Sequence, residues 1–174
     1  MPPKKRGGAV GTIADSSLTL QRFKIDKMRV DGNIALIGKR FSGKSNFLKY
    51  LLQFLCRVCW GVGKIVGISL TEKYNHGFET ELGIDTDFIR SEFDIDFIRR
   101  VIFMQKELFS WLSPDEKKNP RNWLCIIFDD CAHDSKTSNL NEIKEIMFYG
   151  RHFGIICCQL VQDGLKLPRD MREC

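Results

Sequence analysis

One stretch constrains the fold of this chain more than any other: residues 38–45, with the sequence Gly-Lys-Arg-Phe-Ser-Gly-Lys-Ser. It fits the pattern G-x-x-x-x-G-K-[ST] at every fixed position. The apolar run 34–37 before it predicts a buried strand, and residues 46–60 after it predict a helix with one apolar face. A strand, a glycine-rich loop and a helix in this order are the context in which the pattern binds phosphate. A glycine-rich turn that binds nothing is the alternative.

Each residue type in the pattern has a physical role. Gly38 and Gly43 let the backbone bend so that several N–H groups face a phosphate chain, beside the positive end of the following helix. We expect Lys44 to contact the β- and γ-phosphates and the Ser45 hydroxyl to bind Mg²⁺. For Arg40, at a variable position, a solvated side chain is preferred over contact with phosphate. The predicted nucleotide-binding residues are Gly38, Lys39, Arg40, Phe41, Ser42, Gly43, Lys44 and Ser45.

A second apolar run ends in two carboxylates. Residues 123–128 are continuously apolar, which indicates a strand buried on both faces, as in a parallel sheet. Asp129 and Asp130 follow at its carboxyl end, where ligands bind in open α/β sheets. We expect Asp129 to hold Mg²⁺, directly or through water, and Asp130 to orient or deprotonate the attacking water. A solvated strand end is the alternative for both.

The remaining elements follow from periodicity and turn residues. A helix with apolar residues three and four apart is predicted from Ile95 to Leu112, and the polar member of its stripe is Gln105. Partial burial at a packing edge is preferred for Gln105 over a functional role. The other predicted elements are a strand at 64–70, a loop at 71–86, a charged turn at 113–121, a helix at 139–149 and a strand at 153–159 that ends at Gln159. Together they predict an α/β fold, with a mostly parallel sheet flanked by helices on both faces.

Length and charge indicate a single domain with a basic tail. The chain has 174 residues, 43% of them hydrophobic and 28% charged, as in soluble globular proteins. Residues 1–32 carry seven basic and three acidic groups, a net +4 out of a total of +5. We therefore predict a disordered basic tail at 1–18 and one folded domain at 19–174. Lys4-Lys5-Arg6 in the tail fits a localisation signal, a phosphate-contacting arm or a plain solubilising tail.

Neither a membrane segment nor a secretion signal is evident. No apolar run approaches the roughly 18 residues that span a bilayer, so the protein is interpreted as intracellular. The cysteines lie mostly in apolar segments, which favours reduced, packed thiols. Cys56-x-x-Cys59 has the spacing of half a zinc site, but no second close pair completes it, so packing is preferred over metal.

Five features in this order resemble the genome-packaging ATPases of large DNA viruses, which are similar to the FtsK/HerA superfamily of DNA-pumping motors. They are the loop at 38–45, Phe128-Asp129-Asp130, the turn at 150–155, Gln159 and the stretch 167–172. The resemblance extends from about Val30 to the C-terminus and includes Gln105. It implies a RecA-like P-loop NTPase fold, ATP and Mg²⁺ as cofactors, a homo-oligomeric ring, and capsid or virion-assembly partners. The implied function is the translocation of double-stranded DNA into a capsid, at a viral assembly site in the host cytoplasm or in the virion.

The resemblance also implies two further roles. Gln159 corresponds to a sensor of the γ-phosphate, and Arg151 to an arginine finger that reaches the neighbouring subunit's nucleotide. Asp130 departs from the glutamate of much of the superfamily, although the viral branch often shares the aspartate. The chain also stops where family members continue into at least one further strand, so a truncated copy or a fragment is expected.

Two other classes of function compete with this interpretation. A nucleotide kinase or GTPase uses the same loop, but the chain has no [NT]-K-x-D motif, residues 130–133 do not supply D-x-x-G, and an Arg-rich lid is hard to place. The third hypothesis is a non-enzymatic nucleotide-binding or assembly module, and the sequence does not decide against it.

Overall fold

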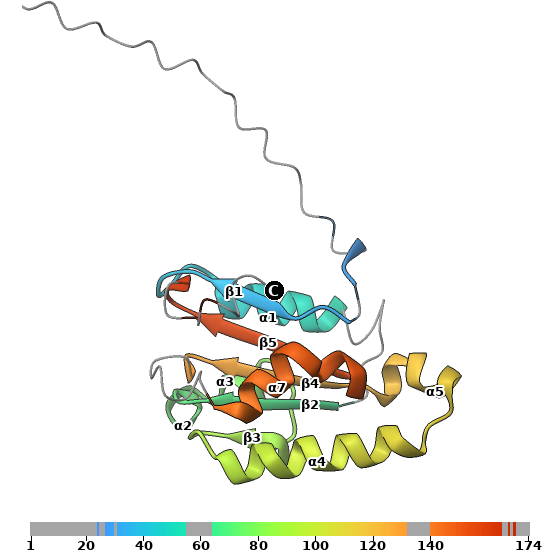
Figure 1. Cartoon of the computed structure of the whole chain (residues 1–174). Helices are drawn as coiled ribbons and strands as arrows, with labels where there is room; N and C mark the ends of the chain where they lie inside the picture. Colours follow the sequence, from blue (N-terminus) through green and yellow to red (C-terminus); the bar gives the residue numbers. More distant parts are fainter. Residues whose placement is uncertain are drawn as a thin grey trace, which may run out of the picture.

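Five parallel strands form the centre of the molecule (Figure 1). The computed structural model describes residues 24, 27–29, 31–54, 64–131, 140–164, 167 and 169. Its sheet has the order β1-β5-β4-β2-β3, and every neighbouring pair is parallel. The strands are β1 (Ile34–Ile37), β2 (Lys64–Ser69), β3 (Ile89–Arg90), β4 (Leu124–Asp129) and β5 (Ile155–Val161). Parallel pairing brings the carboxyl ends of all these strands to one edge of the sheet.

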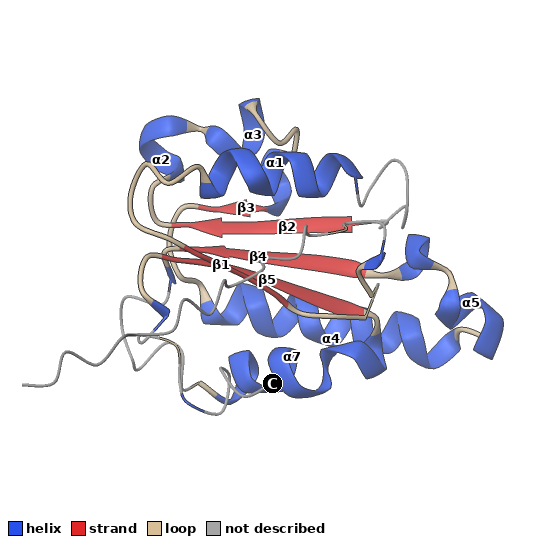
Figure 2. Ribbon diagram, turned by 90° about the horizontal axis from the view of Figure 1, so that it is seen from above, coloured by secondary structure: helices blue, strands red, loops and turns tan. Residues whose placement is uncertain are grey.

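Helices cover both faces of this sheet, which gives three layers (Figure 2). α1, α2 and α3 lie on one face, and α4 and α7 lie on the other. The helices are α1 (Lys44–Phe54), α2 (Glu72–Asn75), α3 (Gly77–Thr80), α4 (Ile95–Trp111), α5 (Pro114–Lys118) and α7 (Asn141–Tyr149). None of the described helices is both long and apolar enough to cross a bilayer.

Alternation along the central strands sends apolar side chains into both helical layers. In β4, Ile126 packs with Ile98 of α4 and Ile143 of α7, whereas Ile127 packs with Leu48 of α1. All seven residues of β5 are buried, as expected of a strand covered on both faces. The predicted α/β fold with a parallel sheet and helices on both faces is therefore confirmed.

Three local expectations were wrong. The segment predicted as a loop at 71–86 contains α2 and α3, and it leads into the two-residue β3. The charged turn at 113–121 contains α5, whose Ser113 and Glu116 form a reciprocal capping box. β5 continues to Val161 and does not end at Gln159. Helices of four or five residues carry too little periodicity to be detected, and a polar residue inside a buried strand resembles its end.

Gln105 is almost fully buried rather than partly buried at an edge. Its Nε2 donates to the carbonyl oxygens of Asn122 at 2.8 Å and Phe153 at 3.1 Å. These carbonyls precede β4 and β5, so the amide ties α4 to the starts of two adjacent strands. The contacts indicate a structural role. The predicted tail at 1–18 and the pair Cys56 and Cys59 lie outside the described residues.

Candidate nucleotide-binding site

The glycine-rich loop connects β1 to α1 at the carboxyl edge of the sheet. Gly43 has a φ of 85°, a conformation that glycine adopts at no steric cost. A Cβ at Gly38 would lie 2.5 Å from Oγ of Ser42, so a larger residue there would require the Ser42 side chain to move. Phe41 also has a positive φ, of 61°, and its side chain is fully exposed. The loop therefore has the tight curvature that its pattern predicts.

Lys44 is the first residue of α1, and its side chain folds back over the loop. Its Nζ donates to the carbonyl oxygen of Gly38 at 2.7 Å and to that of Lys39 at 3.1 Å. These bonds hold the ammonium group beside the turn. A phosphate group in the loop would meet this positive charge together with the positive end of the helix.

Asp129 ends β4 at the same edge of the sheet. It is paired in register with Ser69 of β2, whose hydroxyl donates to its Oδ2 at 3.0 Å. Burial raises the pKa of Asp129 above its ordinary value, and the bond from Ser69 is the strongest opposing effect. The charges of Asp130 and Glu72 raise this pKa further, whereas Lys44 lowers it. A cation at this position would favour the charged carboxylate and relieve the strain of burying it.

Ser45 and Asp129 line the same small cavity, of about 110 Å³. Hydroxyl and carboxylate oxygens are the protein ligands that Mg²⁺ prefers, and the ion usually keeps several waters beside one or two carboxylates and substrate phosphates. The donor set therefore fits Mg²⁺. Among the described residues no group of three or more His, Cys, Asp or Glu is arranged to hold a metal, so a metal here needs water or phosphate to complete its shell.

The structure does not bring all of the predicted residues together. Asp130 follows Asp129 at this edge, in a left-handed conformation with a φ of 53°. Gln159 lies inside β5, two residues before its end, with Nε2 3.6 Å from Sδ of Met147 in α7. It therefore lies on the face of the sheet opposite α1, and not at the tip where it was expected.

Arg151 lies at the other end of the molecule. It belongs to the short 3₁₀ turn Gly150–Phe153, which precedes β5. β5 has seven residues, so at about 3.3 Å per residue it separates Arg151 from the glycine-rich loop by roughly 20 Å. This distance is far beyond the reach of one side chain. Arg151 therefore does not contact the glycine-rich loop of its own chain.

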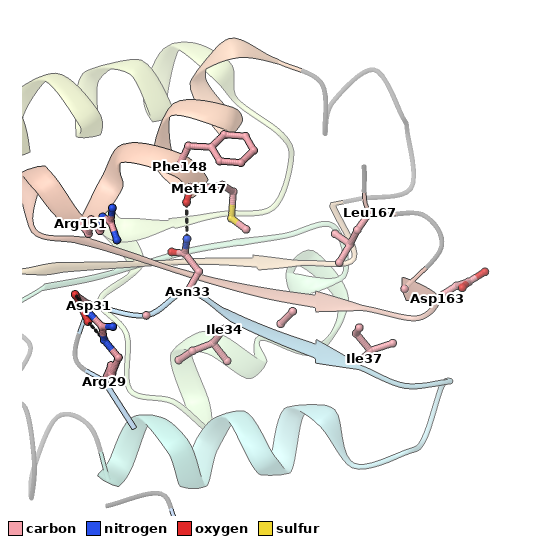
Figure 3. Close-up of a pocket in the computed structure, with 13 residues that line it drawn as sticks. Arg29, Asp31, Asn33, Ile34, Ile37, Met147, Phe148, Arg151, Asp163 and Leu167 are labelled. Carbon is pink, nitrogen blue, oxygen red and sulfur yellow. Dashed lines mark hydrogen bonds and ion pairs between the residues drawn. The ribbon is translucent and has the colours of Figure 1, made fainter. Parts of the chain in front are cut away.

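A larger cavity, of about 890 Å³, runs along β1 on the side of α7 (Figure 3). Arg151, Arg29 and Asp31 lie at one end, and Ile37 and Asp163 line it toward the other. Arg29 donates two hydrogen bonds, of 2.9 and 2.8 Å, to the Asp31 carboxylate. The charge of Arg151 also lowers the pKa of Asp31, after the larger effects of Arg29 and burial. This cavity is separate from the site at Ser45 and Asp129.

Three residues of the site were not predicted from the sequence. Ser69 supports Asp129, and a polar residue that ends the run 65–68, which has no polar side chain, is a signal that could have identified it. Glu72 accepts N–H bonds from Phe78 at 2.8 and 3.0 Å and from Glu79 at 3.2 Å, so it holds α3 beside the small cavity. Gln162 contacts Asp130, and no pattern in the sequence singled it out.

The sequence is similar to uncharacterised proteins of large DNA viruses. Protein 075L of Invertebrate iridescent virus 6 is 32% identical over 139 residues, which cover 80% of this chain and 50% of the relative. Protein L437 of Acanthamoeba polyphaga mimivirus is 27% identical over 158 residues, which cover 88% of this chain and 53% of the relative. The chain thus spans about half the length of these curated relatives. No family model matches it.

Solved structures decide the fold. The genome packaging NTPase B204 of Sulfolobus turreted icosahedral virus 2, solved with AMPPCP, superposes with a TM-score of 0.55 at 17% identity, over 83% of this chain and 71% of B204. The chain has a P-loop NTPase fold. EssC (ATPases 2 and 3) of Geobacillus thermodenitrificans superposes with a TM-score of 0.52 at 15% identity, over 82% of this chain and 30% of EssC. The predicted resemblance of this chain to a viral packaging NTPase is confirmed at the level of the fold.

Proposed function

We propose that this P-loop protein hydrolyses ATP and uses the energy to move double-stranded DNA into a viral capsid. One observation carries the proposal: the loop 38–45 and the carboxylates of Asp129 and Asp130 meet at one edge of a parallel sheet, where Ser45 and Asp129 line the same cavity. The fold likeness to B204, solved with AMPPCP and with ATP-gammaS, supports nucleotide binding at this edge. Viral relatives support a role at a viral assembly site in the host cytoplasm or in the virion.

The residues divide the work between binding and chemistry. Backbone N–H groups of the loop bind the phosphate chain, and Lys44 neutralises charge on the β- and γ-phosphates. Ser45 and Asp129 would hold Mg²⁺, which neutralises negative charge on the phosphates when it is bound. Asp130 orients the attacking water and accepts its proton. Positioning and charge stabilisation of this kind supply most of the rate in phosphoryl transfer.

The DNA and ring parts of the proposal have separate support. Residues 1–32 hold +4 of the net charge of +5, so a contact with the DNA backbone is assigned to this segment rather than to residues 33–174, which are nearly neutral. Arg151 is exposed and lies far from its own loop, which fits a role in the neighbouring subunit of a ring. Capsid or virion-assembly proteins are the further partners that packaging requires.

The test measures phosphate release from ATP and Mg²⁺ by the full chain, with and without linear duplex DNA. We expect hydrolysis, stimulation by DNA, and displacement of a third strand from triplex DNA, which reports translocation. Lys44→Ala should lower turnover by at least about 100-fold. Lys118→Ala, at an exposed lysine of α5, is the matched control and should keep the wild-type turnover.

The other outcomes assign different functions. Hydrolysis without DNA stimulation or strand displacement indicates another kind of P-loop NTPase. Nucleotide binding without hydrolysis indicates a nucleotide-binding or assembly module.

A further inference from the structure

Gln162 lies immediately after β5, at the edge of the sheet where the phosphate-binding loop begins. Val161, the last residue of β5, accepts a hydrogen bond of 3.0 Å from the N–H of Gly38. Gln162 therefore directly follows Val161, the residue that is hydrogen-bonded to the first residue of the loop. Gln162 is half-buried there. No other glutamine in the described part of the chain directly follows a strand at this edge.

The side chain of Gln162 contacts the second carboxylate of the site. Its Nε2 donates to Oδ2 of Asp130 at 2.8 Å. The N–H of Asp130 donates to the carbonyl oxygen of Leu160 at 3.1 Å. Asp130 is thus tied to the end of β5 by its backbone and by its side chain. Its φ of 53° is unfavourable for a residue with a Cβ, so these contacts hold an orientation that the backbone does not prefer.

Gln159 has a different environment, three residues earlier in β5. Side chains alternate along this strand, so Leu160 packs with Leu48 of α1 while Gln159 lies on the face of α7. Gln159 is 6% exposed, and its Oε1 is buried without a hydrogen-bond partner among the described residues. Its amide is therefore directed into the packing against α7, away from the loop.

We propose that Gln162 is a positioning residue for ATP hydrolysis, which holds the Asp130 carboxylate toward the attacking water, and that Gln159 does not take this position. The bond from Gln162 engages Oδ2 and leaves Oδ1 for the water. In the step concerned, the water oxygen bonds to the γ-phosphorus, the bond to the β–γ bridging oxygen breaks, and the water proton passes to Asp130. The inference rests on the proposed ATPase function.

The test compares steady-state kinetics of the full chain and its variants. Gln162→Ala should lower kcat by about 10- to 100-fold, because a carboxylate misplaced by about 1 Å costs a rate of this order. KM for ATP should stay within about twofold, because Gln162 acts on the chemical step and not on nucleotide binding. Gln53→Ala, at an exposed glutamine near the end of α1, is the matched control and should keep the wild-type kcat.

A double-variant cycle separates positioning from a general loss of structure. If Gln162 acts through Asp130, adding Gln162→Ala to Asp130→Asn should lower kcat little further. Gln162→Glu keeps the size of the side chain and places a like charge against Asp130, so it should lower kcat at least as much as alanine. If Gln162→Ala does not fold, Gln162→Glu still tests the positioning role. Fully additive losses would overturn the positioning role.

Two further outcomes keep this inference distinct from the proposed function. If Gln162→Ala keeps the wild-type kcat, or if Gln159→Leu loses more of kcat than Gln162→Ala does, the role of Gln162 is wrong. The proposed ATPase function would be unaffected by either result. A wild-type protein that binds ATP without releasing phosphate overturns the proposed function and this role with it.

Discussion

The hydroxyl group of Ser69 donates a hydrogen bond of 3.0 Å to Oδ2 of Asp129 across the β2–β4 pair. The bond favours the charged carboxylate, while burial opposes it. Ser69→Ala should therefore raise the pKa of Asp129 further and leave the carboxylate less well oriented for Mg²⁺. Losing such a supporting contact typically lowers metal affinity by about 10- to 100-fold.

The measurement is the Mg²⁺ concentration that half-saturates binding of a fluorescent ATP analogue. We expect it to rise by about tenfold in Ser69→Ala. Ser110→Ala, at an exposed serine of α4, provides the control. An unchanged Mg²⁺ requirement would show that Ser69 only fills space between the strands.

Asp129 and Asp130 should behave differently when each becomes asparagine. Asp129→Asn removes the charge at the proposed metal site, so Mg²⁺-dependent nucleotide binding should weaken. Asp130→Asn removes the group that accepts the water proton, so binding should persist while turnover falls by about 100-fold or more. Binding titrations and single-turnover kinetics measure the two effects, with Asp115→Asn on α5 as an exposed control. Equal losses of affinity would mean that the division of roles is wrong.

Long buried elements were predictable because their patterns are strong. The run before Asp129 is too apolar for any element but a strand covered on both faces, and β4 is the centre of the sheet. The stripe of α4 recurs every three or four residues, and its members Ile98, Ile102, Gln105 and Phe109 are buried. The loop 38–45 could be placed because strand and helix flank it. These signals come from the chain's own local periodicity, so they need no knowledge of tertiary contacts.

The partners of the carboxylates could not be predicted in the same way. Gln159 interrupts an apolar run, so it resembled the end of the strand, although Leu160 and Val161 continue the pairing with β1. Which face a side chain occupies depends on the register of β5, and a shift of one residue exchanges the two faces. Ser69 meets Asp129 only because β2 and β4 are neighbours, a fact that local sequence does not contain.

Cys157 and Cys158 should resist alkylation in the folded protein. Both thiols are almost fully buried, and burial raises the pKa of each above its ordinary value of 9.0. The thiolate is the reactive form, and a raised pKa lowers the fraction of thiolate at a given pH. We expect no adducts with iodoacetamide at pH 9 under native conditions and rapid modification of both in urea, measured by peptide mass mapping. Equal rates in the two conditions would contradict the burial of these thiols.

The same shifts predict how stability changes with pH. Well below pH 9 the thiols are neutral in both the folded and the unfolded state, so they do not change the free energy of unfolding with pH. Above the ordinary pKa of 9.0 the unfolded chain ionises while the folded protein does not. The free energy of unfolding should therefore fall as the pH rises beyond that value, measured by urea denaturation. Cys157→Ala should reduce this slope.

Arg151 should act on a neighbouring subunit. It is exposed, and the length of β5 separates it from its own loop. An arginine that completes a neighbour's site increases kcat by a factor on the order of 10³ to 10⁵. Arg151→Ala alone should therefore be nearly inactive. Wild-type activity should also rise steeply with protein concentration. Arg100→Ala, at an exposed arginine of α4, is the matched control and should remain active.

Mixing two inactive variants distinguishes this role from a structural one, in which Arg151 serves as a partner of Asp31. Arg151→Ala subunits keep Lys44, and Lys44→Ala subunits keep Arg151, so some interfaces in a mixed ring contain both groups. In a randomly mixed equimolar ring with head-to-tail interfaces, about one quarter of the sites are complete in this way. ATPase activity of the mixture should recover to a comparable fraction of wild type. Mixtures that assemble together but stay inactive would place Arg151 within its own subunit, where its distance from the loop leaves it a structural role.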